Sequence, residues 1–235
     1  MIPWLEGAPG FPPLERALTE PNGLLAAGGA LDPQWLLTAY RQGIFPWFNP
    51  GEPILWWSPD PRLVLLPEAF RISRSLRKTL RRRLFELRVD SAFSAVIEAC
   101  AAPRAPAAGT WISAEMRAAY LTMHELGYAH SVECWRDDRL VGGLYGMALG
   151  KVFFGESMFS IDTDASKVAL AHLVRFLRLK GYVMIDCQMK TAHLMSMGAR
   201  EISRQQFRDT LDQHACTLQP LRRWPTESVA DMDWT

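Results

Sequence analysis

Two strand-like runs decide the fold of this chain: KVFFGESMFS at residues 151–160 and YVMIDCQ at residues 182–188. Between them, residues 164–180 have the apolar spacing of a long amphipathic helix, which Gly181 ends. Upstream, AHSVECW, the turn RDDR and LVGGLYGMALG predict the other strands of an antiparallel meander. The sequence therefore predicts a sheet with helices packed on it.

Polar side chains stand on both of these apolar runs. Asp186 and Gln188 are two residues apart, so the alternation of a strand places them on one face and Cys187 on the other. Glu156 stands on the first run. Carboxylates and amides at the ends of apolar strands are costly to bury, and they mark either a functional site or a hydrogen-bonded network. We therefore expect the site here, serving a large and partly anionic substrate.

Length and composition bound the class of protein. The chain has 235 residues, is 49% hydrophobic and 22% charged, and carries a net charge of +1, as expected of one large or two small globular domains. The four cysteines lack CxxC spacing, so we expect reduced thiols in a cytoplasmic protein and no zinc site. The N-terminus lacks the basic and apolar regions of a signal peptide, and no apolar run approaches the roughly 18 residues of a membrane helix.

Residues 1–62 are rich in Pro, Gly and Trp and are expected to form a small domain. Asp32 is the expected cap of one short helix there, with Pro33 in its first turn. Because prolines are frequent at residues 44–62, IFPWFNPGEPILWWSPDPR, we expect no interior strand in that segment. Its aromatic side chains indicate either a rigid wall with stacking surfaces or a small Trp-rich core.

A basic helix is expected within RISRSLRKTLRRRLF, at residues 71–85. Ser73 is a candidate cap, and Leu76, Leu80 and Leu84 form one apolar stripe. Seven positive charges and no acidic residue lie in this run. Such a run is either a solvated face or a contact with a phosphate backbone.

The remaining elements complete the fold prediction. RLVLL and FELRVD are expected strands, and helices are expected at residues 91–101, 113–126, 191–197 and 203–213. We therefore predict an α/β (α+β) protein in which the small domain precedes a second domain at residues 63–235, with a mixed sheet flanked by helices. The order of elements is that of acyl-transferring, GNAT-like folds.

Other chemistries fit the residues less well. GESMF around Ser157 lacks the fifth-position glycine of a nucleophile elbow. Cys187 could form a thiol pair with His193, but a cysteine opposite the polar face of a buried strand is more often a core residue. His124 and His130 do not form an HExxH motif, so no metal is expected. A CoA-dependent N-acetyltransferase stays an alternative, although FSIDTDASK has no glycine with which to bind a diphosphate ahead of the long helix.

Several motifs together resemble one family. NGLLAAGG, YRQGIFPWF, ILWWSPDPR, GTWIS, HELGYAHSVE, LVGGLYG, GESMFS, ASKVAL and IDCQ are similar to the bacterial leucyl/phenylalanyl-tRNA–protein transferases over residues 11–213. The resemblance implies a cytoplasmic aminoacyltransferase that moves Leu or Phe, and less readily Met, from aminoacyl-tRNA to the N-terminal Arg or Lys of a protein. It also implies that the product is marked for degradation by the N-end rule pathway. The resemblance implies a GNAT-like domain, no cofactor and no metal, and we expect a monomer.

The resemblance also implies catalytic roles. Gln188 would lie near the attacking amine, Asp186 would orient or polarise it, and Glu156 would face the cationic acceptor. An aminoacyl ester is already activated, so positioning and a weak base suffice. The amide oxygen of Gln188 could accept the amine's hydrogen while the Asp186 carboxylate holds its NH₂ group. Alternatively, Asp186 only holds strand ends together.

The aminoacyl side chain and the terminal adenosine would bind an apolar pocket. The matching positions are Tyr40, Trp47, Trp111, Leu144, Phe153, Phe154, Ser157 and Phe159. Leu144 stands where the family pattern has Met, and Leu173 where it has Phe, which leaves the ranking of Leu, Phe and Met open. Trp47 could instead stack on the adenine. The basic helix would contact tRNA phosphates through Arg74, Arg77, Lys78, Arg81 and Arg82. A second alternative is a non-catalytic tRNA-binding module, in which Asp186 and Gln188 would have no task.

Overall fold

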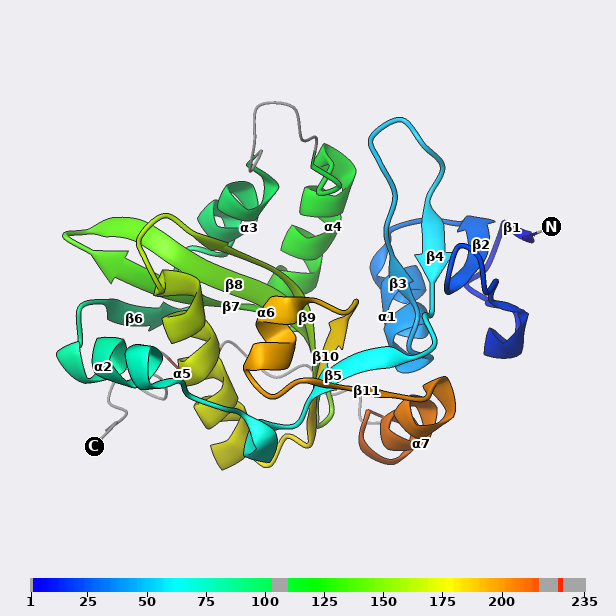
Figure 1. The fold of residues 1–235 in the computed structure, drawn as a ribbon. Coiled ribbons are helices and arrows are strands. Elements are labelled where there is room, and N and C mark those ends of the chain that lie inside the picture. Colours follow the sequence, from blue (N-terminus) through cyan, green and yellow to red (C-terminus); the bar gives the residue numbers. More distant parts are fainter. Residues whose placement is uncertain (1, 103–109, 216–223, 226–235) are drawn as a thin grey trace.

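The computed structural model of the chain describes residues 2–102, 110–215 and 224–225, and it contains two sheets with helices around them (Figure 1). The smaller sheet has the strand order β1 (Trp4–Leu5), β2 (Leu24–Gly28), β4 (Leu55–Trp57), β3 (Phe45–Pro46). The larger sheet has the order β11 (Arg200–Ile202), β5 (Arg62–Leu65), β10 (Met184–Gln188), β9 (Val152–Ser160), β8 (Arg139–Leu149), β7 (Ala129–Arg136), β6 (Glu86–Val89). Both sheets are mixed, which confirms the predicted fold class.

The smaller sheet corrects one prediction about the proline-rich segment. β4 pairs with both β2 and β3, so it is an interior strand, which we did not expect in residues 44–62. The strand forms because ILWW lies between the prolines rather than across them, while Pro46 stands on β3 at the sheet edge, where its missing N–H is tolerated. The expected helix is present as α1 (Pro33–Arg41), and the Asp32 carboxylate accepts the N–H of Trp35 at 3.0 Å.

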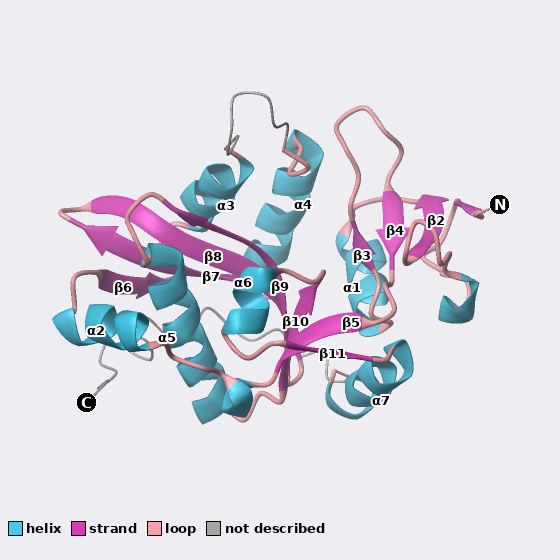
Figure 2. Cartoon of the chain, in the orientation of Figure 1, coloured by secondary structure: helices cyan, strands magenta, loops and turns pink. Residues whose placement is uncertain are grey.

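The larger sheet contains the predicted meander of β7, β8 and β9. α5 (Ala165–Leu179) then carries the chain to β10, which pairs in parallel with β9, whereas the other pairs of this sheet are antiparallel. Helices cover both faces (Figure 2). α3 (Phe93–Ala101) and α4 (Ala114–Glu125) pack on one face, and α5 with α2 (Arg74–Arg82) packs on the other.

The apolar interior forms two clusters, one for each face of the larger sheet. The first core cluster contains side chains of the smaller sheet and of α1, packed against α3, α4 and the facing strands of the larger sheet. The two sheets therefore share one hydrophobic core. The second core cluster lies between the larger sheet and α5. Two short helices complete the fold: α6 (Ala192–Ser196) and α7 (Arg204–His214). A capping box of Ser203 and Gln206 opens α7.

The basic helix forms, but it ends earlier than its leucine stripe predicts. The Ser73 hydroxyl accepts the N–H of Leu76, and Leu76 and Leu80 are buried in the second core cluster. Arg83 takes a left-handed conformation with φ of 47° and ends α2, which leaves Leu84 45% exposed. The prediction that Leu84 belongs to the buried stripe is therefore wrong. Across the described part of the chain, no helix has the length and apolar character needed to cross a bilayer.

Candidate active site

The candidate site lies where β9 and β10 stop pairing. Their parallel ladder ends with Asp186 opposite Phe154. Just beyond, the ladder of β9 with β8 skips Glu156, and the ladder of β10 with β5 skips Cys187. Both strands thus carry an irregularity of one residue at the same level. Such bulges redirect side chains and are frequent beside active sites.

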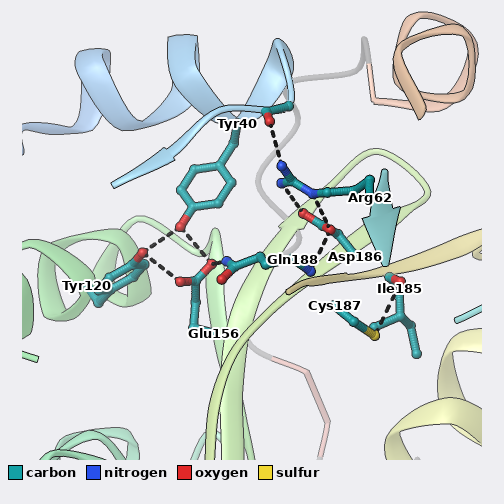
Figure 3. Close-up of polar contacts among 9 residues, drawn as sticks. Tyr40, Arg62, Tyr120, Glu156, Ile185, Asp186, Cys187 and Gln188 are labelled. Atoms are coloured by element: carbon teal, nitrogen blue, oxygen red, sulfur yellow. Dashed lines mark hydrogen bonds and ion pairs between the residues drawn. The ribbon is translucent and has the colours of Figure 1, made fainter. Parts of the chain in front are cut away.

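A fully buried ion pair lies beside this break in the pairing of β9 and β10, which we call the gap. Arg62, at the start of β5, donates Nε to Oδ1 of Asp186 at 2.8 Å and Nη2 to Oδ2 at 2.7 Å (Figure 3). The exposed fractions of the two side chains are 1% and 0%. Oδ1 also accepts the backbone N–H of Gln188 at 2.9 Å. A two-pronged contact of this kind is the strongest geometry available to a carboxylate.

Arg62 is a site residue that sequence reasoning missed. Its Nη1 donates to the carbonyl of Gly43, and its guanidinium carbon lies 4.7 Å and 4.6 Å from the ring centroids of Phe45 and Phe207. One side chain therefore joins β5, β10, α7 and the segment before β3. The only sequence signal was a basic residue at the start of an otherwise apolar strand.

Gln188 links the two carboxylates of the site. Its backbone is left-handed, with φ of 57°, and its N–H points to Asp186. Its Nε2 donates to Oε1 of Glu156 at 3.0 Å. The prediction that Asp186 holds this NH₂ group is wrong, because Arg62 and the backbone N–H take the Asp186 oxygens. Cys187 packs against the second core cluster, as the alternation of β10 predicts.

Glu156 is surrounded by neutral hydrogen-bond donors. Tyr40 of α1 donates to Oε1 at 2.7 Å, and Tyr120 of α4 donates to Oε2 at 3.0 Å (Figure 3). The two hydroxyls also contact each other. Burial raises the pKa of Glu156 to about 7, the negative Asp186 adds to this, and the hydrogen bonds from both tyrosines and Gln188 oppose it.

Tyr120 is the second site residue that the sequence did not reveal, since it reads as an ordinary core position of α4. Burial and the charge of Glu156 raise the pKa of Tyr40, Tyr120 and Tyr145 well above the usual value, so all three stay neutral. The Tyr145 hydroxyl is buried without a hydrogen-bond partner among the described residues. The site therefore holds one carboxylate paired with a cation and one surrounded by phenols.

Part of the predicted pocket gathers on the face of the sheet that carries Glu156. Tyr40, Phe154 and Phe159 belong to the first core cluster, and Trp111 packs against it. Ser157 is half-buried on β9 beside Glu156. Four of these residues thus lie on one side of the larger sheet, and the fifth, Ser157, lies on β9 next to Glu156.

The other predicted pocket residues lie elsewhere. Leu144 and Phe153 belong to the second core cluster, on the side of the sheet covered by α5. Trp47 is 43% exposed between β3 and β4, and its carbonyl accepts the indole N–H of Trp57. No single face of the larger sheet therefore carries all the predicted pocket residues.

The predicted tRNA contacts are exposed on α2, beyond α5 and away from the smaller sheet (Figure 1). They are Arg74, Arg77, Lys78, Arg81 and Arg82. Within residues 2–102, 110–215 and 224–225, no three His, Cys, Asp or Glu side chains gather as a metal site.

Comparison with known proteins gives a consistent match. Residues 64–212 match the family model described as leucyl/phenylalanyl-tRNA protein transferase, and residues 29–60 match that of its N-terminal domain. A leucyl/phenylalanyl-tRNA–protein transferase of Azoarcus sp. is 67% identical over 100% of both chains. One from Aromatoleum aromaticum is 62% identical over 99% of this chain and 98% of that protein. A Staphylococcus epidermidis protein of unknown function is a weak structural match, with a TM-score of 0.41, 12% identity, and coverage of 77% of this chain and 68% of that one.

Proposed function

This chain belongs to the leucyl/phenylalanyl-tRNA protein transferase family, and we propose that its donors are leucyl- and phenylalanyl-tRNA, with methionyl-tRNA used less readily. It is an aminoacyltransferase that moves an amino acid from tRNA to a protein. On this proposal the acceptor carries an N-terminal arginine or lysine. The peptide bond formed there marks the acceptor for the N-end rule pathway.

The single observation that carries the assignment of the site is the polar cluster at the gap between β9 and β10. Gln188 presents an amide whose Nε2 is engaged with Glu156, which leaves its oxygen to accept an N–H of the attacking amine. Asp186 holds the backbone N–H of Gln188 and so orients this amide. Because the aminoacyl ester is already activated, orientation of the amine is the main requirement.

Glu156 gives the cluster its preference for a cationic acceptor. An acceptor with a free N-terminus brings an ammonium group, and an N-terminal Arg or Lys brings a second positive charge. Among the described residues, no cation is hydrogen-bonded to Glu156, so its negative charge is available to the acceptor. The predicted aromatic positions on the same face of the sheet are assigned to the aminoacyl group and the terminal adenosine. They are Tyr40, Trp111, Phe154 and Phe159.

The tRNA is bound through α2 on this proposal. Its two buried leucines hold the helix to the second core cluster, so its cations project outward. Phosphate contacts of this kind orient a nucleic acid without reading its sequence. A two-domain division near residue 62, a monomeric state and a cytoplasmic location belong to the same proposal.

One assay tests the function against its two alternatives. The protein is incubated with leucyl-tRNA and a peptide that begins with arginine, with and without ribonuclease, and the product is read by mass spectrometry. Addition of leucine that ribonuclease abolishes is the expected result. Binding of tRNA without transfer would indicate a tRNA-binding module, and acetylation of the peptide from acetyl-CoA would indicate an acetyltransferase.

A further inference from the structure

The transfer reaction must dispose of a proton, and the two carboxylates beside Gln188 are the candidates to receive it. We propose that Glu156 takes the proton that the acceptor's ammonium group loses before it attacks the ester, and that Tyr40 and Tyr120 are positioning residues that hold this proton in a closed ring of hydrogen bonds. This inference rests on the proposed function.

Asp186 is poorly placed for that task. Oδ1 already accepts two hydrogen bonds and Oδ2 accepts one, all within a fully buried pair with Arg62. A proton added to Asp186 would break the two-pronged contact and leave the Arg62 charge buried without its partner. Uncompensated buried charge is among the costliest defects in a protein interior.

Glu156 differs from Asp186, because one more proton completes the set of hydrogen bonds around it. Three oxygen–oxygen hydrogen bonds join Tyr40 to Glu156, Tyr120 to Glu156 and Tyr40 to Tyr120. When Glu156 is ionised, the two hydroxyls supply only two hydrogens for these three bonds. When Glu156 is protonated at Oε2, it donates to Tyr120, Tyr120 donates to Tyr40, and Tyr40 donates to Oε1. The added proton therefore supplies the third hydrogen of the ring.

The groups that face Glu156 allow its carboxyl group to gain and lose a proton near neutral pH. Tyr40 and Tyr120 face it from α1 and α4, and Tyr145 from β8. Asp186 and Gln188 face it from β10. None of these is a cation. The resulting pKa of about 7 lies close to the value of about 7.7–8.0 that is usual for an α-amino group, so proton transfer between the two is nearly balanced.

The protons of the step balance without any further reactant. The acceptor's ammonium group carries three. One passes to Glu156, and the freed lone pair forms the C–N bond with the ester carbonyl. A second passes to the ribose oxygen as the C–O bond to the tRNA breaks. The third stays on the new amide nitrogen. Glu156 then releases its proton to solvent and is ready for the next acceptor.

The first test is the pH dependence of transfer by Glu156→Gln. The variant keeps the size of the side chain, and its NH₂ group can donate to Tyr120 as the protonated carboxyl does, but it cannot take a proton. We expect it to react only with acceptor that arrives neutral. At saturating leucyl-tRNA, kcat/KM for the peptide should fall by about tenfold near pH 7, where roughly a tenth of the α-amino group is neutral, and the deficit should shrink toward pH 8.5.

A matched control separates this effect from the loss of any buried carboxylate. Glu133 on β7 is fully buried and accepts the backbone N–H groups of Ser91 and Ala92 at the start of α3. Glu133→Gln should show no pH trend in its transfer relative to the parent. If Glu156 were only a counter-ion for the guanidinium of the acceptor's N-terminal arginine, which stays charged throughout this range, the Glu156→Gln deficit would grow up to about pH 7 and then stay constant. That result, or a deficit independent of pH, overturns the inference.

The second test concerns the ring itself. Because the ring closes only when both hydroxyls are present, Tyr40→Phe and Tyr120→Phe should each lower kcat by roughly tenfold, and the double variant by about the same factor. Additive losses of roughly a hundredfold in the double variant overturn the ring. A parent protein that transfers nothing in this assay overturns the proposed function together with the inference, whereas parental transfer with either contrary result overturns the inference alone.

Discussion

Two carboxylates on neighbouring strands, Asp186 and Glu156, flank the same gap and hold the same residue, Gln188, yet their surroundings are opposite. Asp186 accepts the backbone N–H of Gln188 and is paired with the guanidinium of Arg62. Glu156 accepts the side-chain NH₂ of Gln188, and its other donors are phenols. Both carboxylates are buried. The difference lies in whether a cation is buried beside them.

The contrast indicates a division of labour at one site. A carboxylate in a two-pronged ion pair is held rigidly and serves as a fixed support. A carboxylate buried among neutral donors has a raised pKa, which makes it a competent proton acceptor near neutral pH. Neighbouring acids with environments this different typically have different tasks in catalysis. On our proposal Asp186 positions Gln188, and Glu156 exchanges the proton.

The largest effect expected from this comparison is the loss of stability in Asp186→Ala. Removal of one partner leaves Arg62 charged and buried, so the free energy of unfolding should fall by about 3–5 kcal/mol. Turnover should fall by more than roughly tenfold, because Gln188 loses the acceptor of its N–H. Urea denaturation and the transfer assay measure the two effects.

A double variant distinguishes a support from a positioning group. Arg62→Met combined with Asp186→Leu replaces the ion pair with apolar side chains of similar size, and such replacements are close to neutral for stability. We expect the double variant to regain most of the lost stability while transfer stays low. Parental turnover in this variant would mean that Asp186 has no part in positioning Gln188.

The next effect has the opposite sign and concerns Glu156→Gln. The pKa of Glu156 rises from its usual 4.5 to about 7 on folding, so the folded protein binds a proton that the unfolded chain has already lost in that window. The parent's free energy of unfolding therefore falls as pH rises from 4.5 to 7. Glutamine has no proton to lose, so the variant should be more stable than the parent at pH 8, by up to roughly 3 kcal/mol.

The measurement is a pair of denaturation curves for parent and variant, one near pH 5 and one near pH 8. The stability advantage of Glu156→Gln should be small at the lower pH and large at the higher one. An advantage of equal size at both values would show that it comes from packing, and the contrast between the two carboxylates would then lose its electrostatic basis.

The sequence predicted the elements that local pattern controls. The meander, the long helix and the caps at Asp32 and Ser73 depend on residues within a few positions of each other. The shared face of Asp186 and Gln188 likewise follows from the alternation of a strand. Local turn chemistry also explains one error, since the left-handed Arg83 ends α2 before Leu84.

The partners at the site could not be predicted, because they are remote in sequence. Arg62 and Asp186 are 124 residues apart, and the hydroxyls that meet beside Glu156 belong to residues 80 apart. Tyr120 does not differ by pattern from an ordinary core position, and a basic residue at the start of an apolar strand, as at Arg62, does not reveal its partner. Only the tertiary fold reveals which carboxylate receives the cation, and hence that the NH₂ of Gln188 turns to Glu156.

A smaller effect is expected from Gln188→Ala, which cuts the link between the two carboxylates on one side only. The backbone N–H can still bind Asp186, and the side chain that is removed is half-buried, so stability should change by no more than about 1 kcal/mol. Turnover should fall by more than roughly tenfold, since the amide no longer orients the amine. Near-parental turnover would move the orienting role from Gln188 to another group.

The smallest effect separates tRNA binding from chemistry. Variants of either carboxylate should keep the parent's affinity for tRNA, while Arg77→Ala and Lys78→Ala on α2 should weaken it severalfold and leave turnover at saturating tRNA unchanged. The slope of log affinity against log salt should become shallower by about 0.7–0.9 for each phosphate that the variant no longer binds. tRNA binding measured at several salt concentrations reads both quantities.

Arg208→Ala provides the matched control for this last prediction. Arg208 is a partly exposed cation on α7, where it pairs with Glu15, and Figure 1 shows α7 and α2 on opposite sides of the molecule. Its loss removes the same charge, so a general electrostatic attraction would weaken binding equally in all three variants. A reduced slope confined to Arg77→Ala and Lys78→Ala assigns the tRNA to α2. An unchanged slope in both would show that α2 is a solvated face and that the tRNA binds another surface of the protein.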